Sequence, residues 1–217
     1  MRGLLIKDFK LMKGQKNFFI ITLVAAVGMA AFMDDASFVI GYMTFLGAMF
    51  TLSSISYDEF DNGNAFLFSM PITRRDYVVE KYVFGLIVGG ASWILGTAFT
   101  IAGGIMNHSI IVPDTIMGAL SLLPMLLILL AVMLPFHFKF GGEKSRIAII
   151  CAVLIAFAIA FAIVRILALF HIDVVEVLNN LPTMSMGVLI AVILGVSVAL
   201  LFLSYKISVK ILNRKEF

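Results

Sequence analysis

Few side chains in this sequence have the types and spacings that catalysis or metal binding requires. The three histidines, His108, His137 and His171, are isolated and lie near different ends of apolar runs, so they do not form the cluster that a metal ion needs. The centres of the apolar runs carry no acidic residues, which an intramembrane enzyme or a cation-coupled carrier would need. The sequence therefore predicts no catalytic residue and no metal site in this chain.

A glycine-rich turn is expected at residues 137–146, and its run Gly-Gly-Glu-Lys-Ser at 141–145 looks like part of a phosphate-binding loop. Such a loop requires the lysine to follow a glycine directly, but Glu143 separates Gly142 from Lys144. The chain therefore does not bind ATP in this way, and we predict no cofactor bound by the chain itself.

The segment at residues 57–81, YDEFDNGNAFLFSMPITRRDYVVEK, brings acidic and aromatic side chains together. Exposed aromatic residues on a membrane protein are typical of a docking surface for a soluble partner. The alternative is a loop folded against its own helices. Thr73 and Asp76 have the spacing of a capping signal, so we expect a new helix to begin there.

The composition requires an apolar environment for the whole chain. Hydrophobic residues make up 62% of its 217 residues and charged residues 13%, whereas soluble domains average about 45–50% and about 25%. One small globule cannot bury so much apolar surface. The net charge of +3 is spread over short segments between the apolar runs, which suits an anionic membrane surface better than nucleic acid. We predict an all-α polytopic membrane protein with a single domain, residues 1–217.

Six apolar runs are candidates for membrane-crossing helices, which need about 20 mainly apolar residues. The first run is short, and a tight turn at Asp34 and Asp35 joins it to the second, so these two are expected to form a hairpin. The six predicted transmembrane helices lie at about 18–33, 36–56, 82–106, 115–136, 147–170 and 187–205.

The distribution of basic residues predicts the orientation of these helices. Of the 16 Lys and Arg residues, all but Arg165 lie before the first run, between the second and third, between the fourth and fifth, or after the sixth. Because basic residues are retained on the cytoplasmic side, the predicted topology is N-in and C-in. The opposite turns carry acidic residues, namely Asp34, Asp35, Asp114, Asp173 and Glu176.

Two further elements are predicted at the membrane surfaces. Residues 1–17 have an amphipathic, basic character that is typical of an interfacial helix. On the outer side, residues 173–178 predict a short re-entrant helix. Arg165, near the outer edge of the fifth span, either extends to the interface and pairs with Asp173 or Glu176, or forms an outer gate or substrate contact.

The stretch at residues 68–82, FSMPITRRDYVVEKY, resembles the cytoplasmic signature of small bacterial ABC-transporter permeases of the type-two export class. The opening GLLIKDFK at 3–10 and the turn KFGGEKSR at 139–146 also look like this family, so the resemblance covers the whole chain. It implies a membrane-spanning permease subunit of an ATP-driven exporter in the bacterial plasma membrane. ATP and Mg would be bound by a separate ATP-binding-cassette ATPase subunit.

The resemblance further implies that residues 57–81 form a cytoplasmic coupling loop whose short helix seats in a groove of the ATPase. It also implies a second permease subunit, identical or related. Closely similar permeases export amphipathic peptides, including cytolytic and antimicrobial ones. The alternative function is a membrane accessory or immunity protein that binds a partner without transporting. The residues expected to contact the ATPase are Asp58, Glu59, Phe60, Asp61, Phe66, Phe68, Arg74 and Arg75.

Overall fold

The computed structural model describes residues 2–32, 37–60, 63–106, 112–169 and 185–215. Within these ranges all regular structure is helical, which confirms the predicted all-α class. The helices are α1 (Arg2–Gly14), α2 (Lys16–Phe32), α3 (Ser37–Glu59), α4 (Gly63–Ser69), α5 (Arg74–Met106), α6 (Val112–Leu169) and α8 (Met186–Arg214).

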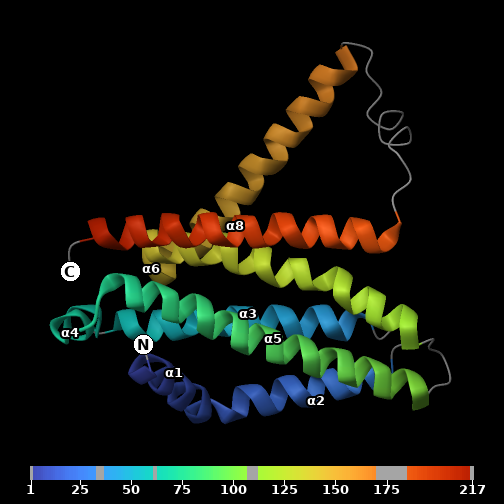
Figure 1. Ribbon diagram of the computed structural model, residues 1–217, viewed down its shortest axis with the longest axis horizontal. Helices are drawn as coiled ribbons and strands as arrows, with labels where there is room; N and C mark the ends of the chain where they lie inside the picture. Colours follow the sequence, from blue (N-terminus) through green and yellow to red (C-terminus); the bar gives the residue numbers. More distant parts are fainter. Residues whose placement is uncertain (1, 33–36, 61–62, 107–111, 170–184, 216–217) are drawn as a thin grey trace.

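The long helices form a bundle with their axes along the molecule's longest dimension (Figure 1). Helix α3 packs against α5, α8 packs against the first part of α6, and α3 and α6 join the two pairs. Helices α1 and α2 meet at an angle of 66° and pack along the side formed by α3 and α5. The start of α1 and the end of α8 lie toward the same end of the bundle as α4 (Figure 1).

Several helices are suited to cross a membrane. The helices α3, α5 and α8 and the part of α6 at Val112–Gly142 are long and apolar enough, and the bent pair α1–α2 adds a fifth span if it counts as one. The structure therefore supports four or five of the six predicted spans, and the complete six-span topology stays a prediction. The predicted re-entrant helix at 173–178 lies outside the described residues.

The capping signal predicted for α5 is confirmed. The backbone N–H of Asp76 donates to the Thr73 hydroxyl over 3.0 Å, and that hydroxyl donates to the Asp76 carboxylate over 2.6 Å. Helix α5 accordingly begins at Arg74 and continues into the membrane-crossing segment without a break. At the other end of the predicted loop at 57–81, α3 continues to Glu59, so residues 57–59 belong to a helix.

The turn predicted between the fourth and fifth spans is shorter than the expected residues 137–146, because the two helices that make up α6 meet at a single non-helical residue. Helix α6 continues through His137 and is interrupted at Gly141, where φ is 76° and ψ is 175°. Essentially only glycine adopts these angles. After this kink, residues 142–169, here called the arm, leave the bundle at an angle (Figure 1). One glycine with positive φ supplies the change of direction, so no loop residues are needed.

Small residues allow α5 to approach α6 closely. A Cβ atom added at Gly89 would lie 2.3 Å from Leu126 Cδ1, and one added at Gly85 would lie 2.8 Å from Leu130 Cδ2. The four-residue spacing places both glycines on one face of α5, where the two leucines fill the space that the missing side chains leave. This contact joins the α3–α5 pair to the α6–α8 pair.

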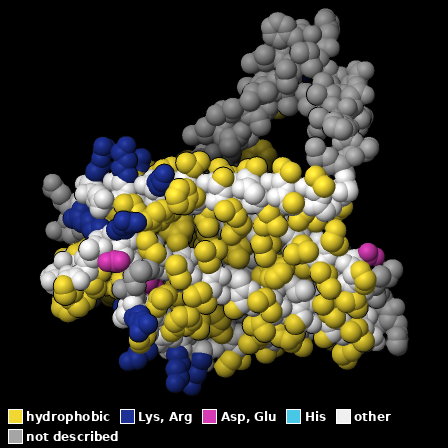
Figure 2. All heavy atoms as spheres, viewed as in Figure 1, with side chains coloured by type: hydrophobic (Ala, Val, Ile, Leu, Met, Phe, Trp, Pro, Cys, Tyr) yellow, Lys and Arg dark blue, Asp and Glu magenta, His cyan; other side chains and the backbone are white. Residues whose placement is uncertain are grey.

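The flanks of the bundle are apolar and the charges lie at its ends. Figure 2 shows hydrophobic side chains covering the visible flank, whereas Lys and Arg gather near α4 and the end of α8. Large apolar side chains of α8, among them Val192, Val196 and Phe202, are exposed. Such a flank is suited to contact with lipid rather than water. The end of the bundle that carries α4 is called the basic end below.

Candidate functional site

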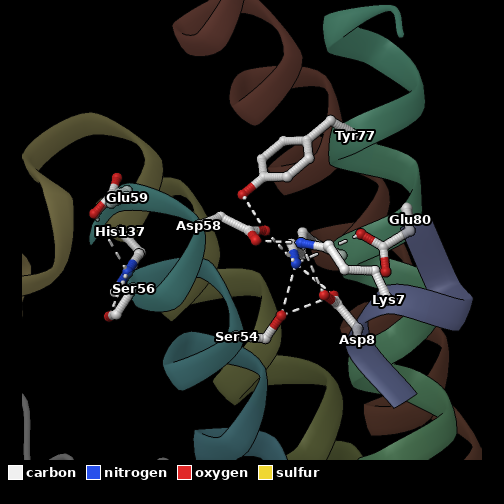
Figure 3. A network of polar contacts seen from close by, with 10 residues as sticks. Lys7, Asp8, Ser54, Ser56, Asp58, Glu59, Tyr77, Glu80 and His137 are labelled. Atoms are coloured by element: carbon white, nitrogen blue, oxygen red, sulfur yellow. Dashed lines mark hydrogen bonds and ion pairs between the residues drawn. The ribbon is translucent and has the colours of Figure 1, made fainter. Parts of the chain in front are cut away.

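Five charged side chains from three helices meet at the basic end (Figure 3). Asp8, Glu80 and Lys81 are 0% exposed, and Asp58 is 8% exposed. Lys7 lies at the edge of this group, which we call the buried ion cluster. Burying a charge is costly unless partners and hydrogen bonds compensate for the lost water, so the contacts within the cluster decide whether it stabilises the fold.

Lys81 lies at the centre of the buried ion cluster. Its ammonium pairs with Asp8 Oδ2, lies 2.8 Å from Asp58 Oδ2 and donates a hydrogen bond to Ser54 Oγ over 2.6 Å. The Ser54 hydroxyl in turn donates to Asp8 Oδ2 over 2.7 Å. The three protons of the ammonium thus meet three acceptors, one from α1 and two from α3.

Asp58 is a second connection within the cluster. Lys7 pairs with Asp58 Oδ1 and lies 3.0 Å from Asp8 Oδ1, and the Tyr77 hydroxyl donates to Asp58 Oδ2 over 3.1 Å. The sequence predicted Asp58 as a contact for a partner protein. The structure instead places it inside, where it joins the end of α3 to α1 and α5.

Glu80 is the least compensated member of the cluster. Neither of its carboxylate oxygens has a hydrogen-bond partner among the described residues, and Lys81 Nζ lies 3.7 Å away. Three carboxyl groups therefore face two ammonium groups. A buried polar group without hydrogen bonds is unusual in a native structure, so Glu80 is the weak point of the arrangement.

Glu59 lies on the other side of α3 and joins this helix to the kink of α6 (Figure 3). The Gly142 N–H donates to Glu59 Oε2 over 2.8 Å, Lys215 Nζ lies 3.6 Å from Oε1, and His137 Nε2 lies 4.0 Å from Oε2. The break at Gly141 leaves the first N–H groups of the arm without helical partners, and a carboxylate is favourable at such a helix start. Glu59 therefore connects the end of α3 to the start of the arm.

Helix α4 presents aromatic side chains on the surface of the basic end. Phe66 is 71% exposed, and Phe60, just before α4, is 72% exposed. The opposite face of α4 is anchored, because Leu67 is buried and the Phe68 ring packs edge-on against Tyr77 with their centroids 5.6 Å apart. The sequence left two alternatives for this segment, a docking surface or a loop folded against its own helices. The structure combines them: one side of α4 packs against the bundle, and the other is exposed.

The two arginines after α4 fasten this segment to α8. Arg74 Nη1 donates to the carbonyl oxygens of Leu212 and Asn213, each over 2.9 Å, and Arg75 Nε donates to the Tyr205 hydroxyl over 3.1 Å. The last carbonyl groups of a helix lack helical partners, so Arg74 supplies donors where α8 needs them. Both arginines were predicted to contact a partner, and both are engaged within the chain.

Other predicted site residues lie elsewhere or outside the described residues. Arg165 is exposed on the arm, with its guanidinium 5.2 Å from the centroid of the Phe161 ring. Asp61, Asp173 and Glu176 lie outside the described residues, so the outer gate stays a prediction. In the part of the chain that the structure describes, no three His, Cys, Asp or Glu side chains are grouped to hold a metal ion.

The sequence analysis missed Asp8, Glu80 and Lys81 as members of a common site. One signal was present: Asp8 follows Leu4 by one helical turn, so it lies on the face of α1 that is buried. An acid on an apolar helix face requires a partner. The identity of that partner, Lys81, is set by packing between helices that are distant in sequence.

A helical bundle with an apolar flank, four or five helices of membrane-spanning length and charges at its ends defines a multi-pass membrane protein. The sequence profile of the ABC-2 family of transporter proteins matches residues 3–213, so the chain belongs to this family. It is therefore a membrane permease subunit of an ABC transporter, of a kind that works with ATPase partners. Neither a curated protein nor a solved structure matches the chain.

Proposed function

We propose that this chain is the permease of an ATP-driven exporter and that Phe60 and α4 form the surface that seats on the ATPase subunit. The exposure of Phe60 and Phe66, 72% and 71%, is the observation that carries the proposal. Both lie at the basic end, away from the apolar flank, so contact with lipid does not account for them. Exposed aromatic side chains on a rigid base are typical anchors of protein interfaces.

The position of α4 in the chain explains how the ATPase would drive the permease. Helix α4 begins four residues after Glu59, the last residue of α3, so a push on α4 acts on the end of α3. Asp58 joins that end to α1 and α5, and Glu59 joins it to the arm. ATP binding in the partner supplies the differential binding energy that shifts the permease between inward-open and outward-open states.

The functional transporter would contain two permeases. Among the side chains of the arm that the structure describes, five large apolar ones are exposed at alternating spacings of three and four residues, which is the spacing of a helix-packing seam. A second, identical or related permease would cover this seam in the bacterial plasma membrane. The seam consists of Ile147, Ile150, Leu154, Phe157 and Phe161.

The proposed cargo is an amphipathic peptide of the cytolytic or antimicrobial kind. Residues 68–82 resemble the cytoplasmic signature of type-two export-class permeases, a class that also handles other cargo, and the export of amphipathic peptides by closely similar permeases supports this choice. The cargo is tested by ATP-dependent uptake of a labelled amphipathic peptide into inverted membrane vesicles. Uptake without dependence on ATP, or no uptake while the ATPase is bound, would contradict peptide export and favour an accessory or immunity protein.

The docking surface is tested by co-purification from native membranes in mild detergent, followed by mass spectrometry. We expect a stoichiometric ATPase subunit with the wild type and its loss when Phe60→Ser and Phe66→Ser are combined. The matched control is Phe38→Ser, because Phe38 is 60% exposed at the opposite end of α3. If the double variant retains the ATPase, the surface is wrong; if the wild type purifies alone, the ATPase partner is wrong.

A further inference from the structure

The carboxyl group of Glu80 on α5 is buried beside another acid and has no hydrogen-bond donor. Neither of its oxygens has a hydrogen-bond partner among the described residues, and the same holds for Asp8 Oδ1 on α1. The Lys81 ammonium lies 3.7 Å from Glu80 Oε2, but its three protons already meet three other acceptors. An ionised carboxyl group in this position would lose its hydration without compensation.

The charges of the buried ion cluster balance when one of its three carboxyl groups is neutral. Asp8 and Asp58 each form ion pairs with both ammonium groups of the cluster. In the part of the chain that the structure describes, Glu80 pairs with Lys81 alone. Glu80 is therefore the acid whose neutralisation costs least. The charged and titratable groups around it are Lys7 and Asp8 of α1, Asp58 of α3, and Tyr77 and Lys81 of α5 (Figure 3).

We propose that Glu80 is a proton-binding site and that the bound proton forms part of the contact between α1 and α5. The protonated carboxyl group donates a hydrogen bond to the Asp8 carboxylate beside it, so one proton supplies the donor that both groups lack. Burial, opposed by Lys81 and reinforced by Asp8, raises the pKa of the Glu80 carboxyl to about 8. Glu80 precedes the predicted span at 82–106, so the proton is exchanged at the basic end.

A proton suits this position better than a metal ion does. The two ammonium groups already neutralise Asp8 and Asp58, so a divalent cation would leave an excess of positive charge in a buried place. Within the described ranges, no three His, Cys, Asp or Glu side chains are grouped to hold a metal ion. A proton adds the single positive charge that the cluster lacks.

The bound proton makes the position of α1 dependent on pH. When α1 separates from α5, Glu80 becomes hydrated, its pKa returns to the ordinary value of about 4.3, and its proton passes to solvent. Between about pH 5 and about pH 8 the docked form holds one proton more than the undocked form, so the equilibrium constant for undocking rises about tenfold per pH unit. Above this range Glu80 is ionised in both forms and the dependence ends.

Any conformational step of the permease that separates α1 from α5 therefore releases a proton at the basic end. The inference concerns only this chain and holds whether or not the proposed ATPase docking is correct.

The proton itself is tested by infrared spectroscopy of the purified full-length protein in an alkyl glycoside detergent, which has no carbonyl group. A protonated carboxyl group has a carbonyl stretching band that a carboxylate lacks. We expect a band in the wild type at pH 7 that disappears above about pH 8 and is missing in Glu80→Gln. Asp114→Asn, an acid-to-amide change at an exposed position, is the control and should keep the band.

The link to α1 is tested by the rate at which an aqueous thiol reagent labels Leu4→Cys in a Cys151→Ser background. Leu4 is buried on α1, so labelling requires undocking. The ratio of this rate to the rate in the additional Glu80→Gln background should rise about tenfold per pH unit between about pH 6 and about pH 8. The ratio cancels the titration of the thiol and of the histidines, which both proteins share. Lys10→Cys, at an exposed position of α1, should give a constant ratio.

Glu80→Met, which is uncharged and similar in size, replaces Glu80→Gln in both measurements if the amide variant does not insert. A wild-type spectrum at pH 7 without the band, or the same band in the Glu80 variants, would overturn the proton site. A labelling ratio for Leu4→Cys that does not change with pH would overturn the role of the proton in the contact between α1 and α5.

Discussion

Asp8 of α1 and Lys81 of α5 form an ion pair in which neither side chain is exposed. The two residues are 73 positions apart in the sequence, and Ser54 of α3 donates a hydrogen bond to one and accepts one from the other. Three helices therefore share one buried polar centre. Because this arrangement compensates the buried charges of Asp8 and Lys81, the N-terminal helix is held on the bundle by more than apolar packing.

Removal of the central cation should destabilise the protein strongly. Lys81→Met leaves Asp8 and Asp58 buried with Lys7 as their remaining cation, so we expect a loss of about 3–5 kcal/mol in the free energy of unfolding. Equilibrium unfolding in detergent micelles can be followed by the fluorescence of Trp93, the single tryptophan. Lys210→Met, at an exposed position on α8, is the control and should change little. Equal stability of both variants would contradict a central role for Lys81.

The two acids beside Lys81 should respond differently to the same chemical change. Asp8→Asn loses hydrogen bonds to a charged group and should cost about 1–3 kcal/mol. Glu80→Gln replaces a buried carboxyl group that has no hydrogen-bond partner among the described residues with an uncharged amide, so it should leave stability unchanged or raise it. The same unfolding measurement compares these two acid-to-amide variants. A loss for Glu80→Gln as large as that for Asp8→Asn would show that the Glu80 carboxylate is compensated after all.

Local sequence patterns were sufficient to predict where helices occur and where α5 begins. Thr73 and Asp76 are three residues apart and act on the same turn, so their spacing alone predicted a cap that the structure confirms. The apolar runs likewise predicted where helices occur, because the need for internal hydrogen bonds in lipid depends on composition and length. Neither inference required knowledge of which helices pack together.

The interior of the candidate site could not be predicted, because its partners are distant in sequence. Asp58 lies beside aromatic residues and was predicted to be exposed, but it is within reach of Lys7 and Lys81 once α1 and α5 pack on α3. Residues 137–146 were predicted to form a tight turn, since glycine pairs are typical of turns. The structure confines this turn to Gly141, and the next N–H, that of Gly142, donates to Glu59 of the distant helix α3.

The close contact between α5 and α6 should not tolerate an added methyl group. Gly89→Ala places a Cβ atom 2.3 Å from Leu126 Cδ1, so we expect a loss of about 1–3 kcal/mol. Gly118→Ala is the control, because a Cβ atom there meets nothing within 4 Å. In a double-mutant cycle, Gly89→Ala combined with Leu126→Ala should cost less than the sum of the single changes. Additive costs would show that the two side chains do not collide.

The kink of α6 should depend on the glycine at its centre. Gly141 has φ 76° and ψ 175°, so Gly141→Ala should either cost about 1–3 kcal/mol or force the backbone into a helical conformation. Gly90→Ala, within α5 and with open space around it, is the control and should be neutral or slightly stabilising.

A spin-label distance across the kink separates these two outcomes. Labels introduced by Val132→Cys and Phe157→Cys, in a Cys151→Ser background, would lie about 38 Å apart along a straight helix of 25 residue steps and closer when α6 is bent. We expect the distance to lengthen in Gly141→Ala, because a straight helix relieves the strain that alanine would otherwise carry. If both the distance and the stability match those of Gly90→Ala, the bend is imposed by the contacts of Glu59 rather than by the glycine.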